Sequence, residues 1–187
     1  MLKDEREIIK RCLKGEKKAM EMLVVNYQKG IFNYFYRNVK NREIAADLTQ
    51  DIFLKVFSKL SFYNFKYKFS TWIYSMSHNH LIDYYRKKKN LSFTSFSSSG
   101  DGNVEFKDKN GNTGEEVLNN TEQKEEIWNA VEKLPPEYKE LIVMRYINEL
   151  KYNEISEILN IPMGTLKNKI FRAKKKLFKI LGEENEK

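Results

Sequence analysis

The sequence predicts an all-α protein made of two helical domains joined by a flexible linker. Three observations support this fold class. Apolar residues recur at spacings of three and four over most of the 187 residues. Residues 91–120 interrupt that pattern and are rich in Ser, Gly, Asn and Asp. Only one short stretch, residues 61–69, alternates with the two-residue period of a strand. We therefore expect a first domain over residues 1–90, a linker over 91–120 and a second domain over 121–183.

The first domain is expected to contain a short helix and three longer ones. Gly15 separates the short helix from a long one that ends near residue 39. Apolar spacing indicates two further helices over residues 43–60 and 70–89, and Ser70 is a suitable N-cap for the second. The apolar stripe of the long second helix consists of Ala19, Leu23, Tyr27, Ile31, Tyr34 and Phe35.

The second domain is expected to end in a helix-turn-helix over Tyr152–Ile170. Helical character starts near Thr121, and the pair Pro135-Pro136 ends one helix and starts another. Asn160 tolerates the left-handed conformation that ends a helix, and Pro162 suits the first turn of the next one. The inward stripe of the last helix consists of Leu166, Ile170, Ala173 and Leu177.

The last helix carries the strongest functional signal. Residues 167–179 contain seven Lys or Arg and no acid. A basic helix with amide and aromatic side chains, placed after a tight turn, suits the major groove of DNA. An αα-hairpin with a solvated lysine face is the simpler alternative. The net charge of +8 also favours a polyanionic partner, although bulk charge is weak evidence.

Composition excludes several other classes of protein. Cys12 is the only cysteine, so no intramolecular disulfide can form. No apolar run reaches the length of a membrane span, and residues 1–10 lack the apolar core of a signal peptide. His78 and His80 are two apart on a helix and point in different directions, so we expect no metal site. No nucleophile–base set or phosphate loop is present, and we expect no cofactor, no catalytic residue and no enzyme activity.

The aromatic stretch at residues 61–69 has two possible roles. Its rings alternate with Lys66 and Lys68, an arrangement on which unpaired bases stack while phosphates are neutralised. The alternative is an aromatic core beneath a loop. A lone strand would have no partner, so we expect an ordered loop.

Four blocks in order resemble the small alternative sigma factors of bacterial RNA polymerase, the extracytoplasmic-function (ECF) type of the sigma-70 family. GEKKAMEMLVVNYQKGIFNYF, DLTQDIFLKVF and KFSTWIYSMSHNHLIDYYRKK resemble the opening, polymerase-binding and promoter-melting helices of sigma region 2. LPPEYKELIVMRYINELKYNEISEILNIPMGTLKNKIFRAKKKL resembles region 4. The linker between them is too short for a region 3 domain.

The resemblance implies a function in promoter-specific transcription initiation and assigns three groups of residues to it. The first group would bind the β′ coiled-coil of core RNA polymerase, the second would recognise and melt the −10 element, and the third would read the −35 element. The polymerase-binding group consists of Asp47, Leu48, Gln50, Asp51, Phe53 and Leu54. The group assigned to the −10 element consists of Tyr63, Asn64, Lys66, Tyr74, His78, Asn79 and Arg86. The group assigned to the −35 element consists of Thr165, Lys167, Asn168, Lys169, Phe171, Arg172 and Lys175.

Two departures from the family pattern bear on the group assigned to the −10 element. His78 stands where the family often has Arg, which weakens a fixed phosphate contact or makes it pH-dependent. The loop at residues 63–69 is unusually aromatic and rich in lysine, so its base preference cannot be carried over from the family.

The single cysteine and the lack of a membrane span or signal peptide predict a cytoplasmic protein. The resemblance implies an anti-sigma factor as a further partner, because the family often uses such an inhibitor, but no residue identifies one. Two other functions remain open from the residues alone. A free-standing helix-turn-helix regulator would use residues 1–90 for dimerisation or effector binding. An RNA-binding or structural helical module is the third reading, although no RNA-binding signature is present.

Overall fold

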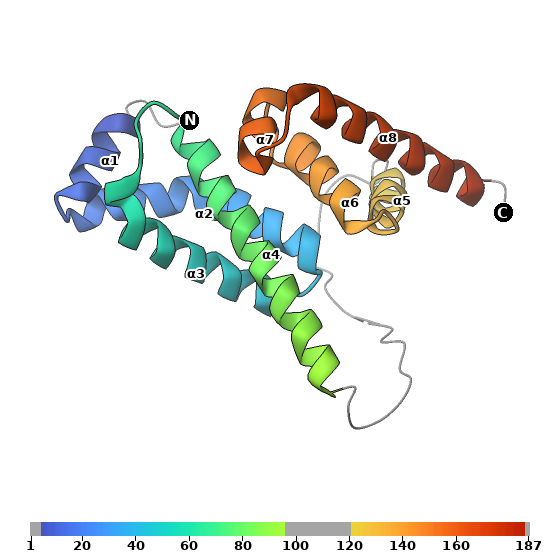
Figure 1. Ribbon diagram of the computed structural model, residues 1–187, viewed down its shortest axis with the longest axis horizontal. Helices are drawn as coiled ribbons and strands as arrows, with labels where there is room; N and C mark the ends of the chain where they lie inside the picture. The colour runs from blue at the N-terminus through green and yellow to red at the C-terminus, as the bar shows by residue number, and fades with distance from the viewer. Residues whose placement is uncertain (1–4, 96–120, 186–187) are drawn as a thin grey trace.

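The computed structural model describes residues 5–95 and 121–185, and these residues form helices and connecting loops without a strand. This result confirms the predicted all-α fold with two helical domains (Figure 1). The elements in chain order are α1 (Glu5–Leu13), α2 (Lys17–Val39), α3 (Arg42–Lys59), the 3₁₀ turn η1 (Leu60–Phe62), α4 (Phe69–Ser95), α5 (Thr121–Glu132), α6 (Pro136–Ile142), the π-helical segment η3 (Val143–Ile147), α7 (Tyr152–Leu159) and α8 (Met163–Asn185).

Local chemistry explains where several of these helices begin and end. Gly15 has a φ of 81°, which a glycine adopts without strain, and it turns the chain between α1 and α2. The side chain of Asn41 accepts a hydrogen bond from the backbone N–H of Ile44 and caps α3. Asn160 ends α7 with a φ of 51°, and the N–H of Ile161 bonds back to the carbonyl of Ser156.

The core of the first domain lies between α2, α3 and α4. Leu23, Ile31 and Phe35 of α2 are fully buried, as are Ile52 of α3 and Ile73 of α4. The stripe predicted for α2 is therefore largely the buried face, although Tyr27 is only partly buried. Burial of these side chains supplies most of the driving force for folding of the bundle.

In the second domain, α6, α7 and α8 pack together and α5 covers one side. Leu166, Ile170 and Ala173 of α8 are buried, as the helical spacing predicts, and Leu177 is partly buried. The helix-turn-helix of α7 and α8 is thus present at the predicted place. The predicted linker at 91–120 lies mostly outside the described residues, and α4 continues through its first five residues.

The two domains pack directly against each other. Figure 1 shows α7 beside the N-terminal half of α4, and these helices share one of the larger contacts in the fold. A single cluster of buried apolar residues runs from the first domain into the second, where it includes Met144, Leu150 and Ile155. Sequence periodicity reports only which face of each helix is buried, so it gave no indication of this docked arrangement.

Candidate protein and nucleic-acid interfaces

The outward face of α3 combines one exposed leucine with polar and acidic neighbours. The side chain of Leu54 is 70% exposed, and Asp47, Gln50 and Asp51 are exposed around it. An apolar centre with a polar rim is the arrangement found at protein–protein interfaces. Of the six residues predicted to bind polymerase, these four lie on the surface. The other two, Leu48 and Phe53, are buried in the core, where they hold the helix in place.

A histidine on α4 lies beside this acidic rim. Nε2 of His80 is 3.5 Å from Oδ2 of Asp51, and Nδ1 of His80 is 2.7 Å from Nζ of Lys55. Burial, reinforced by the neighbouring Lys55 cation, lowers the pKa of His80. His80 is therefore neutral near pH 7, and its ring nitrogen accepts a hydrogen bond from Lys55.

Tyr63 organises the loop between η1 and α4 rather than facing solvent. Its side chain is only 8% exposed, and its ring packs at centroid distances of 5.0 Å from Phe65, 5.4 Å from Phe69 and 5.3 Å from Trp72. Its hydroxyl donates to the carbonyl of Tyr67 at 2.6 Å. The loop is therefore ordered around an aromatic core. A stacking contact between Tyr63 and a base would require this core to open.

The exposed aromatic rings of the loop are Phe62 and Tyr67, which line a hollow of about 420 Å³. Flat rings together with polar edges suit a planar base better than a compact ligand. The group predicted for the −10 element omits both rings, although they belong to the same aromatic run in the sequence. The full lining consists of Phe62, Asn64, Tyr67, Thr71, Trp72 and Ser75 from the first domain, with Glu157 and Asn160 from α7.

Tyr74, predicted to contact the −10 element, is buried between the domains. Nδ2 of Asn148 donates to the Tyr74 hydroxyl and to the carbonyl of Gly30, both at 2.9 Å. Burial raises the pKa of Tyr74 well above the ordinary tyrosine value. A Cβ at Gly30 would lie 2.7 Å from the Tyr74 hydroxyl, so a larger residue there would require the Tyr74 side chain to shift.

His78 makes a second polar junction between the domains. Its Nδ1 lies 2.6 Å from Oε1 of Glu140, and the side chains of these two residues are 16% and 15% exposed. The same Glu140 oxygen accepts a hydrogen bond from the hydroxyl of the fully buried Tyr34. Burial, with the nearby Glu140 carboxylate, raises the pKa of Tyr34, so its hydroxyl stays protonated and donates.

The other members of the group predicted for the −10 element lie on the surface. Asn64 and Lys66 are exposed in the loop, where the Asn64 side chain accepts from the Lys66 N–H at 2.9 Å. Asn79 is exposed on α4, and Arg86 pairs with Asp83 at 2.6 Å one turn away. The structure thus keeps these four accessible and engages the other three, Tyr63, Tyr74 and His78, in internal contacts.

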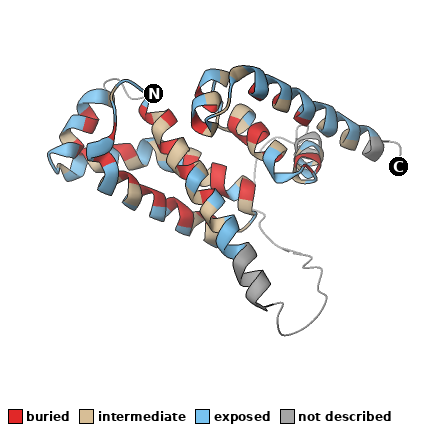
Figure 2. Cartoon of the chain, in the orientation of Figure 1, coloured by how far each residue is buried: buried red, intermediate tan, exposed pale blue. Residues whose placement is uncertain are grey.

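The outer face of α8 presents the residues predicted to read DNA. Phe171 is 67% exposed, and most of the basic residues around it are exposed as well. Figure 2 shows that α8 is exposed over much of its length. Lys169 is the one member of the set that is partly buried, and its Nζ pairs with Glu137 of α6 at 3.1 Å. The exposed members of the predicted set are Thr165, Lys167, Asn168, Phe171, Arg172 and Lys175.

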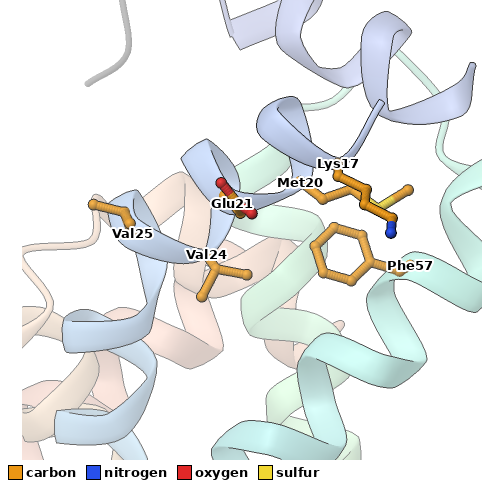
Figure 3. A pocket seen from close by; sticks show the side chains of 6 residues that line it. All are labelled: Lys17, Met20, Glu21, Val24, Val25 and Phe57. Carbon is orange, nitrogen blue, oxygen red and sulfur yellow. The ribbon is translucent and has the colours of Figure 1, made fainter. Parts of the chain in front are cut away.

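An apolar hollow of about 390 Å³ lies in the first domain, between α2 and α3. Figure 3 shows Met20, Val24 and Phe57 lining it, with Lys17 and Glu21 beside them. The side chain of Val25 is exposed at its edge. An apolar hollow with charged residues at its margin suits an amphipathic segment of a protein partner.

The described part of the chain offers neither a metal site nor a membrane span. Residues 5–95 and 121–185 contain no cluster of three or more metal-ligating His, Cys, Asp or Glu side chains. None of the helices in these residues is both long and apolar enough to cross a bilayer.

Comparison with known proteins identifies the family. The sigma-70 region 2 family matches residues 23–91, and the sigma-70 region 4 family matches residues 124–177. The chain is 34% identical to the ECF RNA polymerase sigma factor SigW of Bacillus subtilis (strain 168), over 92% of this chain and 94% of that protein. It is 27% identical to the ECF RNA polymerase sigma-E factor of Escherichia coli (strain K12), over 89% of this chain and 88% of that protein.

Solved structures agree on the fold. CnrH in complex with the cytosolic domain of CnrY aligns with a TM-score of 0.69 at 17% identity, covering 96% of this chain and 97% of that one. The sigma factor RpoE in complex with the anti-sigma factor NepR from Bartonella quintana aligns with a TM-score of 0.68, also at 17% identity, covering 88% and 98%. Together with the match to SigW, the family matches establish that this chain belongs to the extracytoplasmic-function sigma factors of the sigma-70 family.

Proposed function

We propose a division of labour in which α3 binds core RNA polymerase, the loop before α4 takes the −10 element and α8 reads the −35 element. The general activity follows from the family: a sigma factor binds core RNA polymerase and directs it to promoters. The observation that carries the residue assignment is the separation of three chemically different surfaces, one acidic with an apolar centre, one aromatic and one basic.

The polymerase contact is proposed for the exposed residues of α3. Burying Leu54 against a partner would remove its apolar surface from water, which is favourable by about 25 cal/mol per Å². Asp47 and Asp51 would then meet basic groups of the partner, which the family suggests is the β′ coiled-coil. Because the carboxylates form the rim, they contribute to orientation and to the rate of association more than to affinity.

The −35 contact is proposed for the exposed face of α8. Lys167 and Arg172 can donate to guanine edges or to phosphates, and Asn168 can pair with adenine. Phe171 offers an apolar surface to thymine methyl groups. Lys175 lies one turn beyond Phe171 and is better suited to neutralise a phosphate.

The −10 contact is proposed for the hollow between the loop and α4. Phe62 and Tyr67 supply faces on which an unpaired base can stack, and Asn64 supplies an amide that can read its edge. Lys66, Asn79 and Arg86 would hold the displaced strand. Tyr63 supports this surface from beneath, and Tyr74 and His78 become available only when the second domain moves.

A protein inhibitor is the remaining partner. The two solved relatives described above are complexes with the cytosolic domain of CnrY and with the anti-sigma factor NepR. By analogy, we propose an anti-sigma factor for this chain, and the apolar hollow beside Phe57 is a suitable place for one of its helices (Figure 3). We further propose that the protein acts in the cytoplasm with the polymerase and catalyses no reaction of its own.

Transcription in vitro tests the proposed function. Core RNA polymerase and genomic DNA of the source organism are incubated with and without the protein, and the 5′ ends of the transcripts are mapped. We expect new start sites that share two upstream elements and that disappear without the protein. A sequence-specific duplex footprint by the protein alone, with no new start sites, would favour the free-standing regulator instead.

A further inference from the structure

The ring of His80 lies where three helices of the first domain meet, beside the surface proposed for polymerase. Its side chain is only 10% exposed, and its ring packs against the fully buried Phe35 of α2 in a T-shaped arrangement at a centroid distance of 6.2 Å. Its two nitrogens face two different side chains of α3, those of Asp51 and Lys55. The core thus supports the ring from one side, and both nitrogens are directed at α3.

The Lys55 amine determines which nitrogen of the ring carries the proton. Nζ of Lys55 lies 2.7 Å from Nδ1 of His80, and an ammonium group can only donate, so Nδ1 must accept. A neutral imidazole has one proton, which must then sit on Nε2. Burial, followed by the Lys55 cation, lowers the pKa of His80 and keeps the ring neutral near pH 7, while Asp51 and Asp83 oppose this shift only in part.

The proton on Nε2 is directed toward the carboxylate of Asp51. Oδ2 of Asp51 lies 3.5 Å from Nε2, which is longer than an ordinary N–H···O hydrogen bond. Nε2 is buried, and none of the described residues accepts a hydrogen bond from it. A buried N–H group without an acceptor is unfavourable. The Asp51 side chain is 59% exposed, so a small rotation about its own bonds would complete the hydrogen bond to His80.

We propose that His80 is a positioning residue for polymerase binding: its ring, oriented by Lys55, donates from Nε2 to Asp51 and fixes the orientation of that carboxylate. This inference rests on the polymerase contact proposed for α3. One carboxylate oxygen accepts from His80, and the other stays available to a basic group of the partner. A side chain that is already fixed loses less conformational freedom on association, which strengthens binding. His80 acts through Asp51 and need not touch polymerase itself.

Nitrogen NMR of the free full-length chain tests the proton arrangement directly. The sequence has two histidines, so long-range ¹H–¹⁵N spectra contain two sets of ring signals, and His80→Gln identifies the set that belongs to His80. At pH 7.5 we expect a neutral His80 ring with its proton on Nε2. Lys55→Met should raise the pKa of His80 toward the ordinary histidine value, because the neighbouring cation is gone. A ring that is charged at pH 7.5, or that carries its proton on Nδ1, would overturn the inference.

Two substitutions separate the hydrogen bonding of His80 from its packing. His80→Gln supplies an amide that can accept from Lys55 and donate to Asp51, whereas His80→Leu fills the site without either group. We expect His80→Leu to weaken the affinity for core polymerase about three- to tenfold, the effect of one side chain left unfixed before binding. His80→Gln should restore most of that loss. Native affinity in the His80→Leu variant, or equal losses in both variants, would overturn the inference.

A double-mutant cycle with Asp51→Ala shows whether His80 acts through Asp51. Affinities for core polymerase are measured by fluorescence anisotropy at pH 7.5. In the Asp51→Ala background, His80→Leu should cause no further loss, because the carboxylate that it would position is absent. Additive losses would show a general structural defect and would overturn the positioning role. A loss in Asp51→Ala without a loss in His80→Leu would overturn that role alone. Native affinity in Asp51→Ala would instead refute the proposed polymerase contact, and the positioning role with it.

Discussion

Nδ1 of His78 lies 2.6 Å from Oε1 of Glu140, although the two residues belong to different domains of the chain. The resemblance to the family assigns His78 to the −10 DNA. In this arrangement, however, the ring nitrogen of His78 contacts the Glu140 carboxylate. A carboxylate and a phosphate group present similar anionic oxygens to a ring N–H. The contact with Glu140 therefore joins α4 of the first domain to α6 of the second, and it engages the His78 ring that the resemblance assigns to the −10 DNA.

Reversing the charge of Asp51 should weaken assembly with core polymerase. Asp51→Arg places a cation at the rim of the proposed contact, where the partner is expected to be basic, so repulsion replaces attraction. We expect at least a tenfold loss of affinity, which corresponds to about 1.4 kcal/mol. Pull-down or fluorescence anisotropy with core polymerase measures it.

Glu7→Arg is the matched control, because it makes the same charge change at an exposed site on α1. Both variants should keep the circular dichroism spectrum of the native chain. Equal core affinities for the two variants would remove Asp51 from the polymerase contact.

Mutations on α8 should distinguish residues that read bases from residues that contact phosphates. Asn168→Ala should cost about 1–3 kcal/mol on a promoter with the preferred base in its −35 element and little on a promoter that lacks it. Lys175→Ala should weaken all promoters alike and lower the slope of log affinity against log salt by about one. Promoter-variant panels titrated with holoenzyme distinguish these patterns. Lys14→Ala, at the exposed turn that follows α1, controls for the loss of one positive charge. Identical patterns for the two α8 variants would refute the distinction.

The helix-turn-helix could be predicted from sequence because its signals are local. Asn160, Pro162 and the stripe through Leu166 and Ile170 act within a few residues, and the structure places them as predicted. The fold class and the family are confirmed in the same way. The roles assigned to individual site residues stay predictions.

The docked interface could not be predicted, because it joins residues far apart in sequence that share no periodic signal. Asn148 bonds to Gly30 across 118 positions and to Tyr74 across 74. Tyr63 illustrates a second limit of prediction from sequence. An aromatic residue beside lysines can be a stacking surface or a loop core, and only packing around it decides which.

Phe62 offers a cleaner test of the base-stacking surface than Tyr63. Tyr63→Ala would remove a buried ring, at a cost of about 3–5 kcal/mol in stability. A loss of promoter opening in that variant could then come from unfolding as well as from a lost base contact. Phe62 is 81% exposed, so Phe62→Ala should leave the melting temperature nearly unchanged. We expect open-complex formation to fall by the equivalent of about 1–3 kcal/mol, the value of a lost base stack.

Permanganate footprinting on duplex and pre-melted templates measures the effect of Phe62→Ala. The pre-melted template supplies the cost of strand separation but not the lost stack, so rescue should be partial. Full rescue on that template, or normal opening on the duplex, would show that Phe62 does not contact the bases. The exposed Phe178 at the end of α8 gives a control, Phe178→Ala, with a comparable loss of apolar surface.

Gly30→Ala should disturb the contact between the domains. In a helix, Gly→Ala normally stabilises by about 0.5–1 kcal/mol. At residue 30 the new methyl would lie 2.7 Å from the Tyr74 hydroxyl, which is itself held by Asn148. We expect a net loss of thermal stability and faster hydrogen exchange in α7. Gly182→Ala, where nothing lies within 4 Å of the added carbon, should show neither effect. Equal stability of the two variants would mean that Tyr74 moves aside without cost.

The buried amine of Lys139 should make the folded chain more stable as the pH rises above neutral. Its amine is buried against the end of α2, 3.4 Å from the carbonyl of Asn38. Burial, followed by the charge of Lys40, lowers its pKa to about 8, and Glu132 opposes this shift only in part. The folded chain therefore loses this proton at a lower pH than the unfolded chain does, so the destabilisation is complete below pH 8 and is relieved as the pH rises from there toward the ordinary lysine pKa.

Lys139→Met keeps the apolar stem and removes the titrating amine. We expect it to melt at a higher temperature than the native chain at pH 7.5, because the cost of burying the charge is gone. At pH 9.5 the native chain has largely shed that proton, and the difference between the two melting temperatures should shrink. Tyrosines such as Tyr34, whose pKa is raised, contribute equally to both proteins and cancel in the comparison. A difference that stayed constant between pH 7.5 and 9.5 would show that the effect of Lys139 is packing rather than charge.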